Sequence, residues 1–242
     1  MNFSHIDAVI VDLDGTLVDT LDDFCVALKG MLNDLPPPYT HHQVNRAQVA
    51  RWIGQGSEIL IKTVLADVLK GFIPSISGAK NLTGKSQLEA LPEPLYDQAW
   101  ASYQRHYLII NGQHATVFPG VLAGLTHLKT QGLRLACLTN KPTAFAVALL
   151  EAKGLIEFFD FTFGGDAFER KKPDPLPLLK TCEALGSHPA RTLMLGDSRN
   201  DAQAARAAGC PVWLVTYGYN HGQPVRAEDA DGFIDSLAEL GD

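Results

Sequence analysis

The chain has 242 residues, of which 27 are acidic and 20 are basic, and its net charge is -7. Because the charge is negative and no run of Lys or Arg stands out, we expect neither nucleic acid nor an acidic membrane surface as a partner. The N-terminus lacks the features of a signal peptide or a membrane span, so a cytoplasmic protein is expected. Four scattered cysteines without metal-ligand spacing are typical of buried thiols in a reducing compartment: Cys25, Cys137, Cys182 and Cys210.

The first predicted element is a short strand, Ala8–Val11, whose four consecutive apolar residues suit the middle of a parallel sheet buried on both faces. Asp12 and Asp14 follow directly, and Gly15 comes next. Unpaired carboxylates at the end of a buried strand are costly, so a lasting pair implies a cation or a reaction that uses them. An ordinary Asp-Gly turn, with Asp12 as a cap, is the alternative, and this stretch alone does not decide between the two.

The next part of the chain, up to about residue 112, is predicted to be helical. The spacing of its apolar residues indicates helices over residues 21–35, 44–53, 58–69 and 94–107. Residues 71–91 are rich in Gly, Ser, Pro and Lys and are predicted to form a long mobile loop. Nothing in this segment resembles a strand of the main sheet. We therefore expect an inserted helical domain, with hinges at residues 18–21 and 111–118.

From residue 121 onward, helices and strands alternate. Helices are predicted over residues 121–130, 143–153, 174–186 and 202–208, and strands over residues 133–138, 161–163, 193–195 and 212–215. Such alternation produces right-handed crossovers and a parallel sheet covered by helices on both faces. We predict an α/β fold, with a Rossmann-like parallel-sheet core in residues 1–18 and 113–242 and an inserted small α-helical cap in residues 19–112.

Polar residues gather at the carboxyl ends of the predicted strands. Thr139 and Asn140 follow one strand, Asp197 and Asp201 follow another, and Lys172 precedes a helix between them. In an open parallel sheet, ligands bind outside the carboxyl ends of the strands, where the winding reverses. Each residue has an ordinary explanation as a helix cap, a turn residue or a surface charge. Their occurrence together at one edge favours a functional site.

These stretches resemble the four motifs of the haloacid dehalogenase-like hydrolase superfamily. The motifs here are Asp12-Leu13-Asp14-Gly15-Thr16, Thr139, Lys172 before Pro173, and Gly196-Asp197 followed by Asp201. The match covers nearly the whole core, and the helical insertion resembles that superfamily's small cap. The stretches VDLDGTLVDT, TNKPT, KKPDPLPLL and GDSRNDAQAARAAGCP are similar to the bacterial phosphoglycolate phosphatase family. The resemblance implies a Mg²⁺-dependent phosphatase that hydrolyses a small phosphate monoester, 2-phosphoglycolate, to glycolate and phosphate.

The resemblance also implies which residues carry out the reaction. Asp12 would be the nucleophile and become an aspartyl phosphate, which splits the hydrolysis into two easier steps. Asp14 would protonate the leaving oxygen and then accept a proton from the attacking water. Mg²⁺ would be held by Asp12, Asp197 and the backbone carbonyl of Asp14. Lys172 would neutralise Asp12 and the phosphate.

Two further parts of the site follow from the resemblance and from the sequence of the cap. Thr139 and the backbone amides near Asn140 would hold the phosphate oxygens, and Asp201 would support Lys172 or a metal-bound water. In the cap, Gly54-Gln55-Gly56-Ser57 interrupts two helices, and its glycines would allow backbone amides to approach the substrate's carboxylate. An ordinary helix–helix turn is the alternative, with the carboxylate bound instead by Arg51 or Arg105.

Other functions are weighed against this interpretation. A dehalogenase does not need a carboxylate at position 14, so Asp14 favours phosphate-ester chemistry. A sugar phosphomutase or another small-ester phosphatase shares the core motifs, and a catalytically silent phosphate-binding regulator could have the same fold. A small phosphorylated metabolite is the expected partner, and the sequence does not distinguish a monomer from a homodimer.

Overall fold

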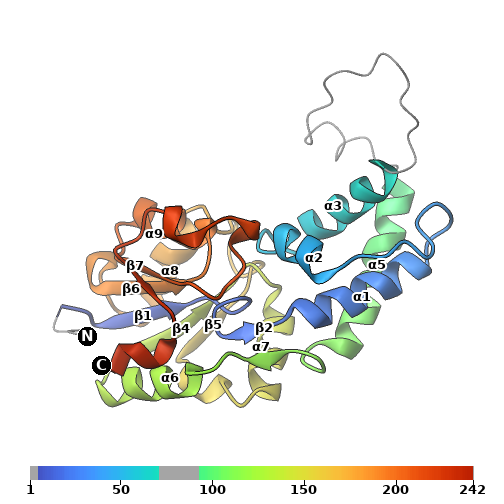
Figure 1. Cartoon of the computed structure of the whole chain (residues 1–242). Coiled ribbons are helices and arrows are strands. Elements are labelled where there is room, and N and C mark those ends of the chain that lie inside the picture. Colours follow the sequence, from blue (N-terminus) through green and yellow to red (C-terminus); the bar gives the residue numbers. More distant parts are fainter. Residues whose placement is uncertain (1–4, 71–92, 242) are drawn as a thin grey trace.

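The computed structural model describes residues 5–70 and 93–241, so the loop predicted over residues 71–91 lies outside the described residues (Figure 1). In the described part, six parallel strands form the main sheet in the order β5-β4-β1-β6-β7-β8. The strands are β1 (Ala8–Val11), β4 (Arg134–Leu138), β5 (Phe161–Phe163), β6 (Thr192–Gly196), β7 (Val212–Val215) and β8 (Gly232–Ile234). The predicted α/β fold is confirmed, although the sequence pattern did not predict β8.

Helices cover both faces of this sheet (Figure 1). They are α6 (Val121–Thr130), α7 (Thr143–Ala152), α8 (Leu176–Leu185) and α9 (Arg199–Ala208). Val9 and Val11 of β1 belong to an apolar cluster with residues of α6 and α7, whereas Ala8 and Ile10 belong to a second cluster with residues of α8 and α9. Because both faces of β1 are buried, its apolar residues run consecutively instead of alternating with polar ones.

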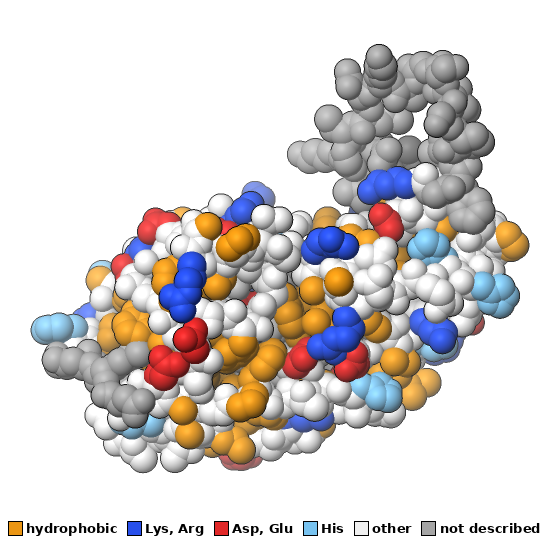
Figure 2. Space-filling model, viewed as in Figure 1, with side chains coloured by type: hydrophobic (Ala, Val, Ile, Leu, Met, Phe, Trp, Pro, Cys, Tyr) orange, Lys and Arg blue, Asp and Glu red, His pale blue; other side chains and the backbone are white. Residues whose placement is uncertain are grey.

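The remaining helices pack together beside the sheet and form the cap. They are α1 (Leu21–Asn33), α2 (Arg46–Trp52), α3 (Ser57–Lys70) and α5 (Glu93–Ile110). The apolar faces of these helices form one cluster of buried residues. Phe145 of α7, a core helix, is also buried in this cluster. In Figure 2, basic and acidic side chains are interspersed over the core and the cap on the face shown. No helix in the described ranges is sufficiently long and apolar to span a bilayer.

The chain crosses between core and cap through a small antiparallel ribbon. Its strands are β2 (Val18–Asp19) and β3 (Thr116–Val117), which pair Val18 with Val117 and Asp19 with Thr116. The two expected hinge segments are therefore hydrogen-bonded to one another. Strands of two residues are too short to show a period in the sequence, which is why this ribbon was not predicted.

Candidate active site

Asp12 lies at the carboxyl end of β1, in the centre of the sheet. Its backbone N–H donates to the Leu195 carbonyl at 2.9 Å, so the ladder with β6 extends to this residue. β1 separates β4 from β6, and the chain reverses its winding between those two strands. Thr139 and Asp197, which follow them, therefore lie at the same edge as Asp12. The cavity at this edge is lined by six of the residues predicted in the core: Asp12, Asp14, Thr139, Asn140, Lys172 and Asp197.

The turn after Asp12 brings the backbone close to Asp197, and Gly15 makes this approach possible. Gly15 has φ +91°, and a Cβ at this position would lie 2.5 Å from Oδ2 of Asp197. The same Oδ2 accepts a hydrogen bond from the Tyr219 backbone N–H at 2.6 Å, and Oδ1 accepts one from the Thr16 hydroxyl at 3.4 Å. Gly15 is therefore required both by its backbone conformation and by the close packing of Asp197.

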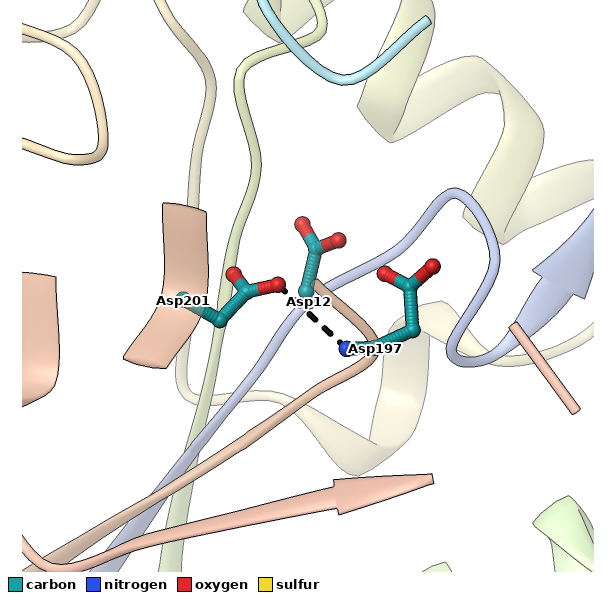
Figure 3. Close-up of side chains that lie close together, drawn as sticks. All are labelled: Asp12, Asp197 and Asp201. Atoms are coloured by element: carbon teal, nitrogen blue, oxygen red, sulfur yellow. Dashed lines mark hydrogen bonds between the residues drawn. The ribbon is translucent and has the colours of Figure 1, made fainter. Parts of the chain in front are cut away.

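Three buried carboxylates meet at this edge of the sheet, as Figure 3 shows. Asp12, Asp197 and Asp201 offer oxygens that all lie within 4.8 Å of one another. Burial raises the pKa of Asp12 to about 7, against the opposing charge of Lys172. Burial and the charges of Asp201 and Asp12 raise the pKa of Asp197 well above its ordinary value. A set of hard oxygen donors that repel one another fits Mg²⁺, which would relieve the repulsion.

Lys172 is the cation that partly balances these carboxylates. Its ammonium donates to Asp12 Oδ1 at 2.8 Å, to Asp201 Oδ1 at 2.7 Å and to the Leu138 carbonyl at 2.7 Å. Burial would lower the pKa of Lys172, but Asp12 and Asp201 outweigh it and the pKa is raised. The side chain of Asn140 also fixes the Lys172 backbone, because its Oδ1 accepts from the Lys172 N–H at 3.0 Å and its Nδ2 donates to the Lys172 carbonyl at 2.9 Å.

Asp201 has two functions, one for each carboxylate oxygen. Oδ1 binds Lys172, whereas Oδ2 accepts from the Ser198 backbone N–H at 3.1 Å and from the Ser198 hydroxyl at 2.7 Å. Ser198 and Asp201 thereby form a capping box that begins α9 at Arg199. The prediction that this helix begins at Ala202 is wrong, because the helix begins three positions earlier, at Arg199, directly after its cap residue Ser198.

Asp14 is paired with a lysine that the sequence analysis missed. The Lys141 ammonium lies 3.0 Å from Asp14 Oδ1 and 2.6 Å from the hydroxyl of Tyr107, a residue of the cap helix α5. It also lies 4.6 Å from the ring centroid of Phe24 in α1. Lys141 stands directly after Asn140 in the TNKPT stretch, but nothing in its local spacing indicates partners so distant in the sequence. The lysine connects the core, the cap and the predicted acid–base residue.

The cap loop predicted to bind the substrate's carboxylate, residues 54–57, lies against the core. The Gly54 carbonyl accepts hydrogen bonds from Asn140 Nδ2 at 2.8 Å and from Asn200 Nδ2 at 3.0 Å. Gly54, Gly56 and Ser57 line the cavity together with Asp12, Asp14 and Lys172. His221 also lines it, and its Nε2 lies 3.3 Å from Asn200 Nδ2. The sequence analysis did not single out Asn200 or His221.

The other predicted cap residues lie outside the lining of this cavity. Gln55 is exposed and does not line the cavity, so the prediction that it contacts the substrate is not supported by its position. Arg51 is exposed, and its Cγ is packed close to Gly222. Arg105 forms an ion pair with Asp34 at 2.7 Å. Neither arginine is therefore in position to meet a ligand in the closed arrangement that the structure shows.

Gly56→Ala is expected to lower kcat/KM about tenfold, whereas Gln55→Ala changes it less than twofold. Gly56 has φ +90°, where any other residue is strained, and an added Cβ would lie 3.4 Å from the Asn140 carbonyl oxygen. Such strain costs on the order of 1–2 kcal/mol, and loosening the cap relieves it. Steady-state kinetics of both variants check the prediction, and equal effects at the two positions would contradict it.

The metal-free protein is expected to become less stable as the pH rises from 5 to 8. The pKa of Asp12 is about 7 in the folded protein, above its ordinary value of 3.8. The folded state therefore binds the proton more tightly than the unfolded state, and this stabilisation is lost as the pH rises through 7. The loss is roughly 1–3 kcal/mol from this group, and Asp197 acts in the same direction. Lys172 does not contribute to the change in stability between pH 5 and 8, because its pKa is raised above its ordinary value of 10.5 and it stays charged throughout.

Thermal melts with chelator and with Mg²⁺, at pH 5 and pH 8, measure this effect. Mg²⁺ should raise Tm more at pH 8, where the carboxylates are charged, and the difference should shrink in Asp197→Asn. Equal melting temperatures with and without Mg²⁺ at pH 8 would count against a preformed acidic site.

In the described residues, an α/β core beside a helical cap brings buried carboxylates and a lysine together at the switch point of its parallel sheet. Residues 6–209 match the sequence profile of the haloacid dehalogenase-like hydrolases, and the chain belongs to this family. The resemblance drawn from the motifs is thereby confirmed. Among its relatives, the phosphoglycolate phosphatase of Thiobacillus denitrificans is 43% identical over 97% of this chain and 93% of the relative. The phosphoglycolate phosphatase of Nitrosospira multiformis is 40% identical over 97% of this chain and 93% of the relative.

Solved structures show the same architecture. A predicted phosphoglycolate phosphatase from Haemophilus somnus is similar with a TM-score of 0.86 and 30% identity, and the match covers 98% of this chain and 96% of that one. A putative phosphoglycolate phosphatase from Lactobacillus delbrueckii has a TM-score of 0.80 at 23% identity, with coverage of 97% and 96%. The second match supports the fold alone.

Proposed function

We propose that this protein is a Mg²⁺-dependent phosphatase that hydrolyses 2-phosphoglycolate to glycolate and phosphate. The observation that carries the proposal is the convergence of Asp12, Asp14 and Lys172 on one cavity that is closed by the cap. The identity of 43% to a phosphoglycolate phosphatase over nearly the whole chain supports the choice of substrate. We also propose residues 19–112 as the cap and the cytoplasm as the protein's location.

Asp12 attacks the phosphorus atom and becomes an aspartyl phosphate. Lys172 stands 2.8 Å from Asp12 Oδ1 and holds the attacking carboxylate in place, while its charge offsets that of the incoming phosphate. Asp201 fixes Lys172 from the opposite side at 2.7 Å. When bound by Asp12, Asp197 and the Asp14 carbonyl, Mg²⁺ supplies positive charge that stabilises the phosphoryl oxygens.

Asp14 then acts twice, first as an acid and then as a base. It protonates the leaving oxygen of glycolate and afterwards takes a proton from the water that hydrolyses the aspartyl phosphate. Lys141 orients its carboxylate from 3.0 Å. Thr139 and the backbone amides near Asn140 bind the phosphate oxygens from the end of β4, where both residues are buried. The cap excludes bulk water during both steps, since Gly54 is hydrogen-bonded to the core.

A panel of small phosphate esters tests the proposal. With Mg²⁺, 2-phosphoglycolate should give the highest kcat/KM, above those of hexose phosphates and p-nitrophenyl phosphate, and chelator should abolish the activity. Interconversion of sugar phosphates without release of phosphate would instead identify a phosphomutase. Binding of phosphate without turnover of any ester would identify a silent regulator.

A further inference from the structure

Among the described residues that line the cavity are two lysines, Lys141 and Lys172, whose ammonium groups are engaged in different ways. The three N–H groups of Lys172 are used by Asp12, Asp201 and the Leu138 carbonyl. Lys141 donates to both oxygens of the Asp14 carboxylate, at 3.0 and 3.3 Å, and to the hydroxyl of Tyr107 at 2.6 Å. Because the two bonds to Asp14 go to a single carboxylate, one N–H shared between its oxygens serves both, and the third N–H of Lys141 is then available to another acceptor.

Lys141 is held in place by the groups around it. Its side chain is 2% exposed and lies in the lining of the cavity. The rings of Phe24 and Tyr107 lie against the ammonium, with centroids 4.6 and 4.8 Å away, and both rings come from cap helices. A charge fixed in a site shielded from water interacts with an anion far more strongly than the same charge on the surface.

The position of Lys141 relative to Asp14 fits the shape of the proposed substrate. In 2-phosphoglycolate a single carbon separates the leaving oxygen from the carboxylate. If Asp14 donates a proton to the leaving oxygen, the substrate's carboxylate must lie beside Asp14, on the side away from the phosphorus. The Lys141 ammonium lies 3.0 Å from Asp14 Oδ1 and is therefore next to this position.

The other basic residues considered for this task are less suited to it. Arg51 and Arg105 do not line the cavity, and Lys172 has no donor to spare. His221 lines the cavity, but burial lowers its pKa and keeps the imidazole neutral at pH 7. Among the described residues that line the cavity, Lys141 is therefore the cation best placed to meet a second anionic group.

We propose that Lys141 binds the carboxylate of the substrate and thereby selects phosphorylated hydroxy acids over alkyl phosphates that lack a carboxylate. The inference rests on the proposed function, because it assigns the part of the substrate that the phosphate site does not bind. The substrate's carboxylate is then recognised by a core lysine, which the aromatic rings of the cap hold in position, and not by the glycines of the cap loop.

The test compares 2-phosphoglycolate with ethyl phosphate, which has the same carbon next to the leaving oxygen but no carboxylate. Lys141→Met removes the charge and keeps a side chain of similar length. In this variant, the kcat/KM for phosphoglycolate divided by the kcat/KM for ethyl phosphate should fall by about 10- to 100-fold. A fall of this size is expected when a hydrogen bond to a charged group is lost. Any loss caused by misplacing Asp14 affects both substrates and cancels from the ratio.

Lys171→Met is the matched control. It removes the same charge from a lysine that is exposed and does not line the cavity. It should leave the ratio within twofold of the wild-type value. An unchanged ratio in Lys141→Met would overturn the inference and make Lys141 a positioning residue for Asp14 alone. An equal fall in both variants would also overturn it, by assigning selectivity to overall charge. Failure of the wild-type protein to hydrolyse phosphoglycolate would be a separate result, against the proposed function itself.

Discussion

Asp12→Asn is expected to lower kcat on the order of 10⁴-fold or more, to the background of the assay. An amide oxygen is too weak a nucleophile to attack phosphorus, and the other two carboxylates of the described buried cluster are already engaged. Asp197 is engaged by the Tyr219 N–H and the Thr16 hydroxyl, and Asp201 is held by Ser198 and Lys172. Mass spectrometry of quenched reactions should find the phosphoryl group on Asp12 in the active protein and on no residue in the variant.

Asp14→Asn provides the contrast, because it removes the acid–base group and keeps the nucleophile. This variant should still become phosphorylated from an aryl phosphate, whose leaving group needs no proton, but should lose the phosphoryl group slowly. A phosphorylated peptide that lacks Asp12 would show that another residue is the nucleophile. The melting temperature of each variant establishes that it is folded.

Lys172→Met is expected to lower both activity and the free energy of unfolding. The substitution leaves Asp12 and Asp201 buried without their shared cation, and breaking a buried ion pair from one side costs about 3–5 kcal/mol. At pH 8, urea unfolding without metal should show a loss of this size. At pH 5 the loss should be smaller, because the Asp12 carboxyl, whose pKa is already about 7 with the lysine present, is then protonated.

Lys180→Met is the matched control for stability. Lys180 pairs with Glu183 at 2.9 Å, but the two side chains are 50% and 72% exposed. An exposed pair of this kind contributes about 0–1 kcal/mol, so the control should unfold nearly as the wild type does. Similar losses in Lys172→Met and Lys180→Met would mean that the buried lysine has no special role in stability.

The predictable part of the fold and site was the part encoded by neighbouring residues. β1 could be recognised because four apolar residues in a row end abruptly at Asp12, and the same unbroken apolar run predicted its position in the middle of the sheet. Lys172 could be placed near this edge of the sheet from the sequence pattern, but its role beside Asp12 was implied only by the family resemblance. Once the sheet is folded, its ammonium meets Asp12, which lies 160 positions away in the chain.

The parts that were missed depend on contacts between distant segments. Lys141 became recognisable only when the fold placed it 3.0 Å from Asp14 Oδ1 and against cap aromatic rings. Asn200 forms part of a helix start, and it contacts Gly54 of the cap, which lies 146 positions away in the chain. Local periodicity describes which face of an element is buried, but it does not describe which polar groups meet across an interface.

The ribbon of β2 and β3 gives the cap a simple place in the topology of the chain. Asp19 pairs with Thr116, so the chain leaves the core and returns to it at neighbouring positions. The cap is thus the loop of a β-hairpin, and lengthening such a loop adds only slowly to the entropy of closing it. A domain attached in this way can be exchanged or enlarged without altering the register of the main sheet. New substrate preferences can therefore arise in the inserted domain while Asp12, Asp197 and Lys172 stay where they are.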